Sequence, residues 1–156
     1  LSRIKGVGQA KACLLLASAE LIKRALEVKE EVAPIIKTVD DVVAQSIYMK
    51  DKTREHFMVL YLNARNELIF KKPMFVGTLN VNIVHPREIF GEAIKQNAAF
   101  MIFCHNHPSG NEQPSQVDLE INKRLVEAGK IMGIEPLDHI IITKTKVFSF
   151  KESGLM

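Results

Sequence analysis

The sequence lacks the marks of a membrane or secreted protein. No apolar run approaches the ~20 residues that a membrane-spanning helix needs, and no signal peptide is visible at the start. Only two cysteines are present, Cys13 and Cys104, both in apolar surroundings. This pattern argues against a disulfide scaffold and predicts two buried free thiols in a reducing compartment, so we expect a cytoplasmic protein. Because the first residue is Leu1 and not Met, we expect the sequence to continue from a longer protein.

The chain also has little excess charge. Its formal net charge is +3, from 21 basic and 18 acidic residues. Electrostatic nucleic-acid binders usually concentrate Lys and Arg on one face, so this small surplus does not by itself indicate a nucleic-acid partner. At 156 residues, 47% of them hydrophobic, the chain is long enough for one hydrophobic core and a short appendage.

The N-terminal part has the pattern of a helical fragment. Apolar residues recur at helical spacing over residues 10–31, and a tight turn at residues 4–8 stands ahead of that helix. The pattern lapses around Pro34, where we place the domain boundary. The chain is therefore expected to divide into a helical fragment, residues 1–33, and a compact domain, residues 34–156.

Short apolar segments in the compact domain predict strands. The clearest alternates over residues 55–62, which sorts its side chains onto two faces: Phe57, Val59 and Tyr61 on one, and Met58, Leu60 and Leu62 on the other. Residues 68–70 are predicted to return as a hairpin, and residues 75–77 to form a third short strand. Residues 98–104 predict a strand buried on both faces, and residues 137–142 and 147–150 a closing hairpin.

Three helices are predicted between these strands. Thr38 and Asp41 form a capping box that opens the first, which ends near Gln45. The second begins at Pro86 and runs to about Asn97, and its inward residues are Ile89, Phe90, Ala93 and Ile94. The third has an apolar stripe of Val117, Ile121, Leu125, Ala128 and Met132, with Gly133 just past its end. The predicted fold class is α/β, a mixed sheet flanked by helices.

Two histidines, His105 and His107, follow the apolar segment 98–104. Side chains of a strand repeat with period two, so both rings are expected on the same side of the sheet. The chain then returns into a helix that starts at Ser115, and Asp118 lies in its first turn, so a third ligand comes from a separate element. Two nitrogens and one oxygen, with a position left for water, form a recognised catalytic zinc arrangement.

These residues also have ordinary structural interpretations. Ser115 and Asp118 form a capping box on their own, and the two roles are compatible because only one carboxylate oxygen need meet a metal. A pair of histidines two residues apart is a weak signal alone, but an Asp ten residues further on makes it specific. Glu55 is either the base that a hydrolase needs or an exposed charge at the end of a strand beside Arg54.

The order of these residues resembles the JAMM (MPN+) metal-dependent peptidase motif. That motif is carried here by Glu55, His105-x-His107-Pro108, Ser115 and Asp118. More narrowly, the chain resembles the bacterial RadC family over nearly its whole length. The stretches that carry the likeness are Gly77-Thr78-Leu79-Asn80, His85-Pro86-Arg87-Glu88, His105-Asn106-His107-Pro108-Ser109-Gly110, Pro114-Ser115 and Asp138-His139.

The resemblance implies a cytidine-deaminase-like α/β fold, a JAMM domain, with zinc on His105, His107 and Asp118. It also implies Glu55 as the base that acts on zinc-activated water, and Ser115 as a residue that helps to hold the water or the developing oxyanion. The implied reaction is metal-assisted hydrolysis of a peptide or isopeptide bond in a protein or peptide substrate. The family also carries the label of DNA repair protein.

The N-terminal turn and helix resemble part of a helix-hairpin-helix element. Glycines at a helix start expose backbone N–H groups that can bind a phosphate, and Lys5 and Lys11 would assist, which makes DNA a possible partner of residues 1–33. The first helix of such an element is missing, however, and glycines are common at ordinary helix starts.

Three functions are therefore weighed. The first is a zinc-dependent amide hydrolase, and the second is a metal-containing binding module that acts in DNA repair or recombination without turnover. The presence of Glu55 favours the first, because a scaffold needs no base. A nucleobase deaminase fits the fold, but its His-x-Glu and Pro-Cys-x-x-Cys signature is absent. The other histidines, His56, His85 and His139, are interpreted as structural, with His85 preceding or capping a helix.

Overall fold

The computed structural model describes residues 4, 6–26, 33–77 and 84–156. They belong to two compact units, Leu1–Val32 and Ala33–Met156. Within the described residues, no helix has both the length and the apolar character needed to cross a membrane.

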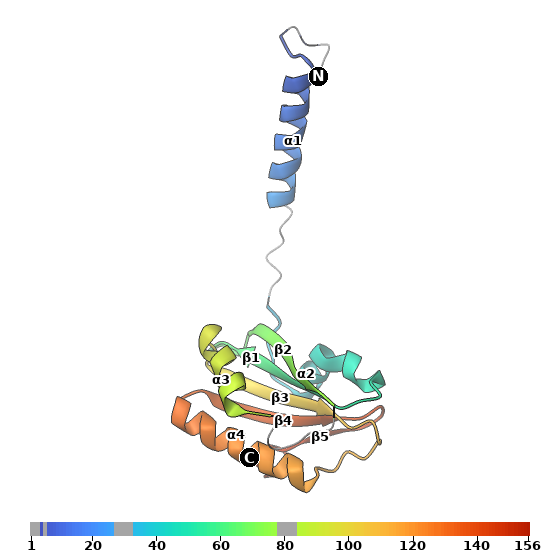
Figure 1. The fold of residues 1–156 in the computed structure, drawn as a ribbon, viewed down its shortest axis with the longest axis vertical. Coiled ribbons are helices and arrows are strands. Elements are labelled where there is room, and N and C mark those ends of the chain that lie inside the picture. Colours follow the sequence, from blue (N-terminus) through green and yellow to red (C-terminus); the bar gives the residue numbers. More distant parts are fainter. Residues whose placement is uncertain (1–3, 5, 27–32, 78–83) are drawn as a thin grey trace. The chain divides into compact units, whose positions relative to one another are not determined.

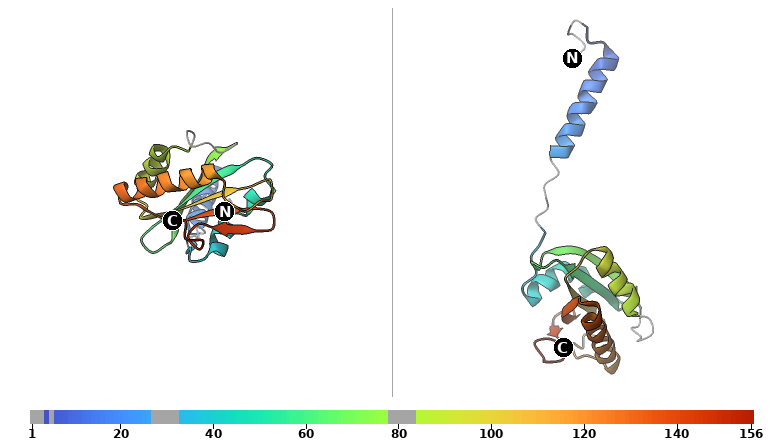
Figure 2. Two further views of the ribbon diagram at one scale, coloured as in Figure 1. Left: turned by 90° about the horizontal axis from the view of Figure 1, so that it is seen from below. Right: turned by 90° about the vertical axis from the view of Figure 1, so that its left-hand side faces the viewer.

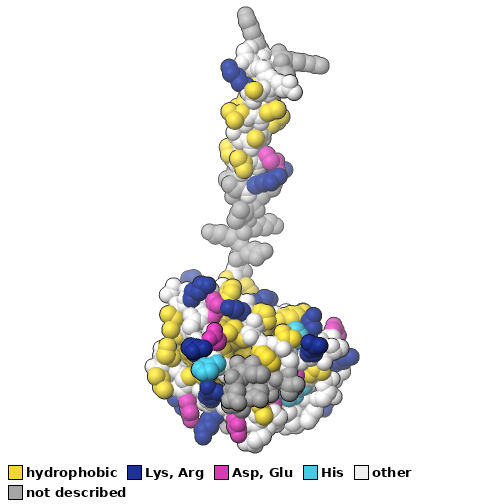
Figure 3. Space-filling view, in the orientation of Figure 1, with side chains coloured by type: hydrophobic (Ala, Val, Ile, Leu, Met, Phe, Trp, Pro, Cys, Tyr) yellow, Lys and Arg dark blue, Asp and Glu magenta, His cyan; other side chains and the backbone are white. Residues whose placement is uncertain are grey.

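The smaller unit contains the helix α1 (Gln9–Leu26). A turn precedes it, in which the Val7 N–H donates to the Ile4 carbonyl at 3.0 Å. Residues 27–31, which were expected to continue this helix, lie outside the described residues. Large apolar side chains line its surface (Figure 3): Leu14, Leu15, Leu16, Leu21 and Ile22 are all more than half exposed. The prediction that Cys13 is buried is wrong, because among the described residues of this unit no second helix or strand covers it.

The larger unit is built on one five-stranded sheet in the order β2-β1-β3-β4-β5 (Figure 1). The strands are β1 (His56–Leu62), β2 (Leu68–Val76), β3 (Phe100–Asn106), β4 (Glu135–Ile142) and β5 (Val147–Ser149). Only β3 and β4 are parallel, and the other neighbours are antiparallel. The predicted mixed sheet flanked by helices is therefore confirmed, and β3 lies at its centre.

Helices cover both faces of this sheet (Figure 2). On one face, α3 (Pro86–Lys95) and α4 (Gln116–Met132) pack against Phe57, Val59 and Tyr61 of β1. On the other, α2 (Val39–Ser46) and the 3₁₀ helix η1 (Ile47–Asp51) pack against Met58, Leu60 and Leu62. The two-face sorting predicted for this strand is thus confirmed, and its six residues are at most 1% exposed.

The helix ends follow the local rules that the sequence obeys. The capping box of Thr38 and Asp41 is present at α2, and His85 caps α3 by accepting a hydrogen bond from the Arg87 N–H at 3.2 Å. Gly133 ends α4 in the left-handed conformation, with φ of 67°.

For two residues, Ile94 and Met132, the prediction that the side chain faces the core is wrong. Ile94 is 55% and Met132 is 45% exposed, because both lie at the margins of their helices' apolar stripes. They line an open apolar depression between α3 and α4 instead of the core beneath them.

The two short strands expected at residues 68–70 and 75–77 are also wrong, since β2 is one continuous nine-residue strand with a register shift near Pro73. Lys71, Lys72 and Pro73 suggested a break. An edge strand accepts them, because one side of its backbone needs no partner strand and proline has no N–H to satisfy there.

Candidate metal centre

The site forms at the end of β3, the central strand. His105 is fully buried and pairs with Phe57 of β1 on one side and Ile141 of β4 on the other. His107 lies just beyond the strand, but its N–H donates to the Ile142 carbonyl at 3.0 Å. This bond extends the strand geometry by one residue, so the two imidazoles leave the sheet on the same side, as the period-two spacing predicted.

Asp118 reaches the two rings from the first turn of α4. Its Oδ2 accepts hydrogen bonds from the backbone N–H of Ser115 at 2.7 Å and from the Ser115 hydroxyl at 2.6 Å. The Ser115 oxygen in turn accepts from the Asp118 N–H at 3.2 Å, which completes the capping box. The cap thereby holds a carboxylate that is only 2% exposed. Capping and a place at the site therefore coexist in this residue.

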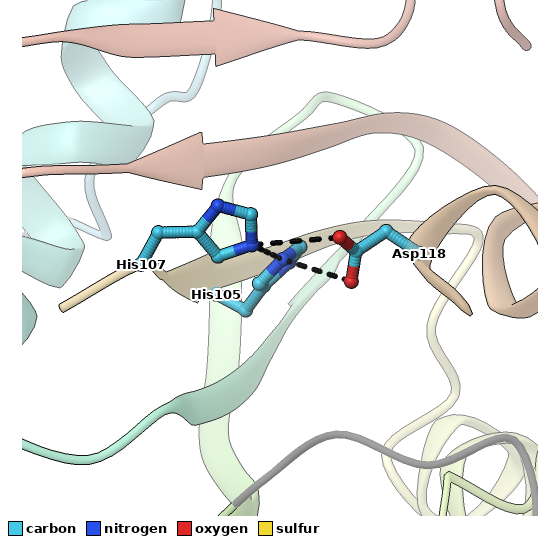
Figure 4. Close-up of side chains that lie close together, drawn as sticks. All are labelled: His105, His107 and Asp118. Atoms are coloured by element: carbon cyan, nitrogen blue, oxygen red, sulfur yellow. Dashed lines mark hydrogen bonds and ion pairs between the residues drawn. The ribbon is translucent and has the colours of Figure 1, made fainter. Parts of the chain in front are cut away.

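The two histidines and the aspartate converge on one point (Figure 4). The distance from His105 Nε2 to Asp118 Oδ1 is 3.2 Å, and that from His107 Nε2 to Asp118 Oδ2 is 3.4 Å. The two Nε2 atoms are 3.0 Å apart. Within the described residues, this is the group whose ligand atoms all lie within 4.8 Å of one another and that could hold a metal ion.

The charges of this cluster suit a cation. Burial alone would raise the pKa of Asp118, but hydrogen bonds from His105 and His107 outweigh it and hold that pKa well below its usual range. Burial lowers the pKa of His105, despite the opposing effect of Asp118. For His107, burial is outweighed by the combined effect of Asp118 and the Asn111 carbonyl, so its pKa is raised. The cluster therefore presents an ionised carboxylate between two imidazoles.

The proton positions at His107 also suit metal binding. Its Nδ1 lies 2.7 Å from the Asn111 backbone carbonyl, which can only accept a hydrogen bond. Nδ1 must then carry a proton. When the ring is neutral its lone pair is on Nε2, where a cation would take the place of the hydrogen bond to Asp118. Two imidazole nitrogens and one carboxylate oxygen on converging elements are a set of ligand atoms that suits a metal ion such as zinc.

Glu55 lies one residue before β1. Its carbonyl accepts the Gly77 N–H at 2.8 Å, so its backbone continues the pairing of β1 with β2. It lines a surface depression of about 370 Å³ together with His107, Ser115 and Asp118. The structure thus brings the predicted base, the predicted serine and two of the three predicted ligands to one depression. His105 lies buried beneath them.

Two residues near the site were missed as contributors by the sequence analysis. His139 of β4 places its Nε2 2.9 Å from Nδ1 of His105. Asn106, which points away from the two histidines that flank it, bonds to the backbone around Glu55. A histidine in an apolar strand was visible in the sequence, but the register between β3 and β4 was not.

The remaining predictions for single residues have mixed outcomes. Cys104 is buried on the opposite face, 3.2 Å from the Ser46 hydroxyl, as expected. DNA binding by residues 1–33 stays a prediction: Lys5 and part of the neighbouring turn lie outside the described residues, and the Lys11 ammonium donates to the Gly6 carbonyl. Residues 78–80 of the Gly77–Asn80 stretch also lie outside the described part.

Comparison with known proteins identifies the family of the larger unit. A family model described as "RadC-like JAB domain" matches residues 36–155. The chain belongs to the RadC-like JAB domain family. The mixed sheet with its flanking helices is consistent with the JAB-type α/β fold, so the resemblance seen in the motifs is confirmed.

Similarity over nearly the whole of this chain to other RadC-family proteins supports the same assignment. The chain is 45% identical over 159 residues to UPF0758 protein YsxA of Bacillus subtilis (strain 168), an alignment that covers all of this chain and 68% of the relative. It is 46% identical over 157 residues to a UPF0758 protein of Desulforamulus reducens, with 100% and 69% coverage. It is 47% identical over 155 residues to a UPF0758 protein of Bacillus cereus (strain 03BB102), with 97% and 68% coverage. None of these names states a reaction.

Proposed function

We propose that this RadC-like JAB domain is a zinc-dependent hydrolase that cleaves a peptide or isopeptide bond in a protein or peptide substrate. The observation that carries the proposal is the convergence of His105, His107 and Asp118, with Glu55 on the wall of the same depression. A structural zinc site usually has four protein ligands, often cysteines, whereas a catalytic site keeps one position open. Three ligands beside an accessible carboxylate fit the catalytic type.

Each residue has a distinct task in this proposal. His105, His107 and Asp118 would hold the ion. Zinc held there would lower the pKa of a water molecule toward about 7 and polarise a carbonyl oxygen. The Glu55 carboxylate accepts a proton from the attacking water and delivers it to the leaving amine, so one C–N bond is exchanged for one C–O bond. Such general acid–base catalysis is typically worth about 10²–10⁴-fold in rate.

We propose two tasks for Ser115 at the site. Its hydroxyl donates to Asp118 Oδ2, so it orients a proposed ligand. It also lines the depression, where we propose that it helps to hold the water or the developing oxyanion. The second task requires the Ser115 O–H to turn away from Asp118. A bound cation would permit this, because it would neutralise part of the Asp118 charge and weaken the hydrogen bond from the hydroxyl.

A cleavage assay with a mixed library of peptides and isopeptide-linked peptides tests this function. We expect zinc-loaded protein to cleave some members and, in ¹⁸O-labelled water, to place the label in the new carboxylate. Glu55→Gln should keep its zinc and lose about 10²–10⁴-fold in rate. Equal turnover by Glu55→Gln would contradict the role of the base.

A cellular experiment separates the hydrolase from the metal-containing binding module. If the Glu55→Gln protein keeps its zinc and still supports the cellular function of the wild type, the binding module is the better explanation. Loss of that function in a zinc-loaded Glu55→Gln protein supports hydrolysis.

A further inference from the structure

His139 is a fully buried histidine on β4, directly opposite Phe103 of β3. Its Nε2 lies 2.9 Å from Nδ1 of His105, within the range of a hydrogen bond. His105 Nδ1 is the ring nitrogen that does not face Asp118 and His107. The contact thus joins His139 to the back of a proposed metal ligand.

Three aromatic side chains fix the orientation of the His139 ring. Phe150 stacks on it with ring centroids 4.5 Å apart and an interplanar angle of 14°. Phe57 and Phe103 meet it edge-on, with centroids 5.6 Å and 5.8 Å away. A ring held in this way presents Nε2 to His105 in one direction only.

The proton on this contact decides whether His105 can bind a metal. A neutral imidazole carries one proton. If that proton of His105 is on Nδ1, it is donated to His139 Nε2, and His105 Nε2 has a lone pair that a cation beside Asp118 could use. If His139 donates instead, the His105 proton lies on Nε2 and occupies the ligand position.

We infer that His139 is a positioning residue: its Nε2 accepts the Nδ1–H of His105 and so selects the His105 tautomer whose Nε2 can bind a metal ion. Outer hydrogen bonds of this kind fix the tautomer and orientation of metal-binding histidines. To accept this hydrogen bond, Nε2 of His139 must carry a lone pair. Its proton is then on Nδ1, an atom without a hydrogen-bond partner within the described residues.

Zinc affinity of three folded variants tests the inference, which rests on the metal site of the proposed function. Dissociation constants are measured by competition with a chelator. His139→Phe keeps an aromatic ring among its three neighbours but removes the acceptor, and it should bind zinc about 10–100-fold more weakly than the wild type. His139→Gln, whose side-chain oxygen can accept the bond, should recover affinity relative to His139→Phe. His56→Phe, a matched change outside this contact, should bind like the wild type.

The outcomes separate this inference from the function on which it rests. A wild type that binds no zinc overturns both. A wild type that binds zinc and a His139→Phe that binds it equally tightly overturn the role of His139 alone. Should the variants not fold, nitrogen NMR of histidine-labelled, zinc-loaded wild type gives the answer directly. We expect His139 protonated on Nδ1, and protonation on Nε2 would overturn the inference.

Discussion

The side-chain oxygen of Asn106 accepts a hydrogen bond from the backbone N–H of His56 at 2.7 Å. The nitrogen of the same amide donates to the carbonyl of Arg54 at 3.1 Å. These bonds anchor the peptide groups on both sides of Glu55 to a residue that stands between His105 and His107. One amide therefore links the segment of the proposed base to the strand of the proposed ligands.

Replacing Asn106 with Leu should loosen Glu55 without removing a ligand. Buried polar groups left without partners cost about 1–3 kcal/mol, so the free energy of unfolding should fall by that order. Zinc stoichiometry should stay that of the wild type, while the His56 amide should exchange its hydrogen faster. Hydrogen-exchange NMR measures this, and unchanged protection of the His56 amide would show that Asn106 does not anchor the segment.

Ser115→Ala should affect both stability and the metal. Loss of an N-cap costs typically ~1 kcal/mol, and here it also removes a hydrogen bond to Asp118 Oδ2, so zinc affinity should fall about tenfold or more. Thr38→Ala is the matched control, since it breaks the capping box of α2 far along the chain from the ligands. Chelator competition on both proteins decides the matter. Equal zinc affinity in the two variants would contradict a role for Ser115 at the site.

Two glycines in helices should respond oppositely to alanine. A Cβ at Gly129 of α4 would lie 2.5 Å from Pro136 Cδ and 2.8 Å from the Ile134 carbonyl, so Gly129→Ala should destabilise the fold by about 1–3 kcal/mol. Gly91 of α3 has open space at that position, and Gly91→Ala should stabilise it by about 0.5–1 kcal/mol through helix propensity. Urea unfolding measures both changes. A stable Gly129→Ala protein would show that α4 does not pack closely on β4.

The two cysteines should differ sharply in reactivity toward iodoacetamide. Burial raises the pKa of Cys104 to about 12, against a smaller opposing effect of the Ser46 hydroxyl. At pH 8 only ~10⁻⁴ of the molecules then carry the reactive thiolate. As long as the pH stays below the pKa, each rise of one pH unit increases that fraction tenfold. Mass spectrometry of the folded protein should show alkylation of the exposed Cys13 alone, and of both residues after denaturation. Rapid labelling of Cys104 in the folded protein would contradict its burial.

Local rules were sufficient for much of the fold. The two capping boxes, the cap at His85, the left-handed Gly133 and the two faces of β1 depend on residues within a few positions of one another. The three proposed ligands could be predicted for the same reason, because two histidines at period-two spacing and a carboxylate in the first turn of the next helix are both visible in the sequence.

The features that were missed depend on contacts between distant segments. The continuity of β2 through Pro73 depends on its place at the sheet edge, and the exposure of Ile94 depends on how α3 lies over the sheet. His139 meets His105 only because β4 pairs in parallel with β3 in one register. Asn106 reaches the backbone around Glu55 because β1 and β3 are neighbours. No pattern within a single segment contains that information.

Metal analysis of the purified protein tests the proposed centre most directly. Wild type and His107→Ala are saturated with zinc, freed of excess metal and measured by mass spectrometry, with His85→Ala as a control outside the site. We expect about one zinc per chain in the wild type and in His85→Ala, and little in His107→Ala, since three ligands of this type hold one ion. A folded His107→Ala protein that retains zinc at the wild-type level and affinity would contradict a centre built from His105, His107 and Asp118.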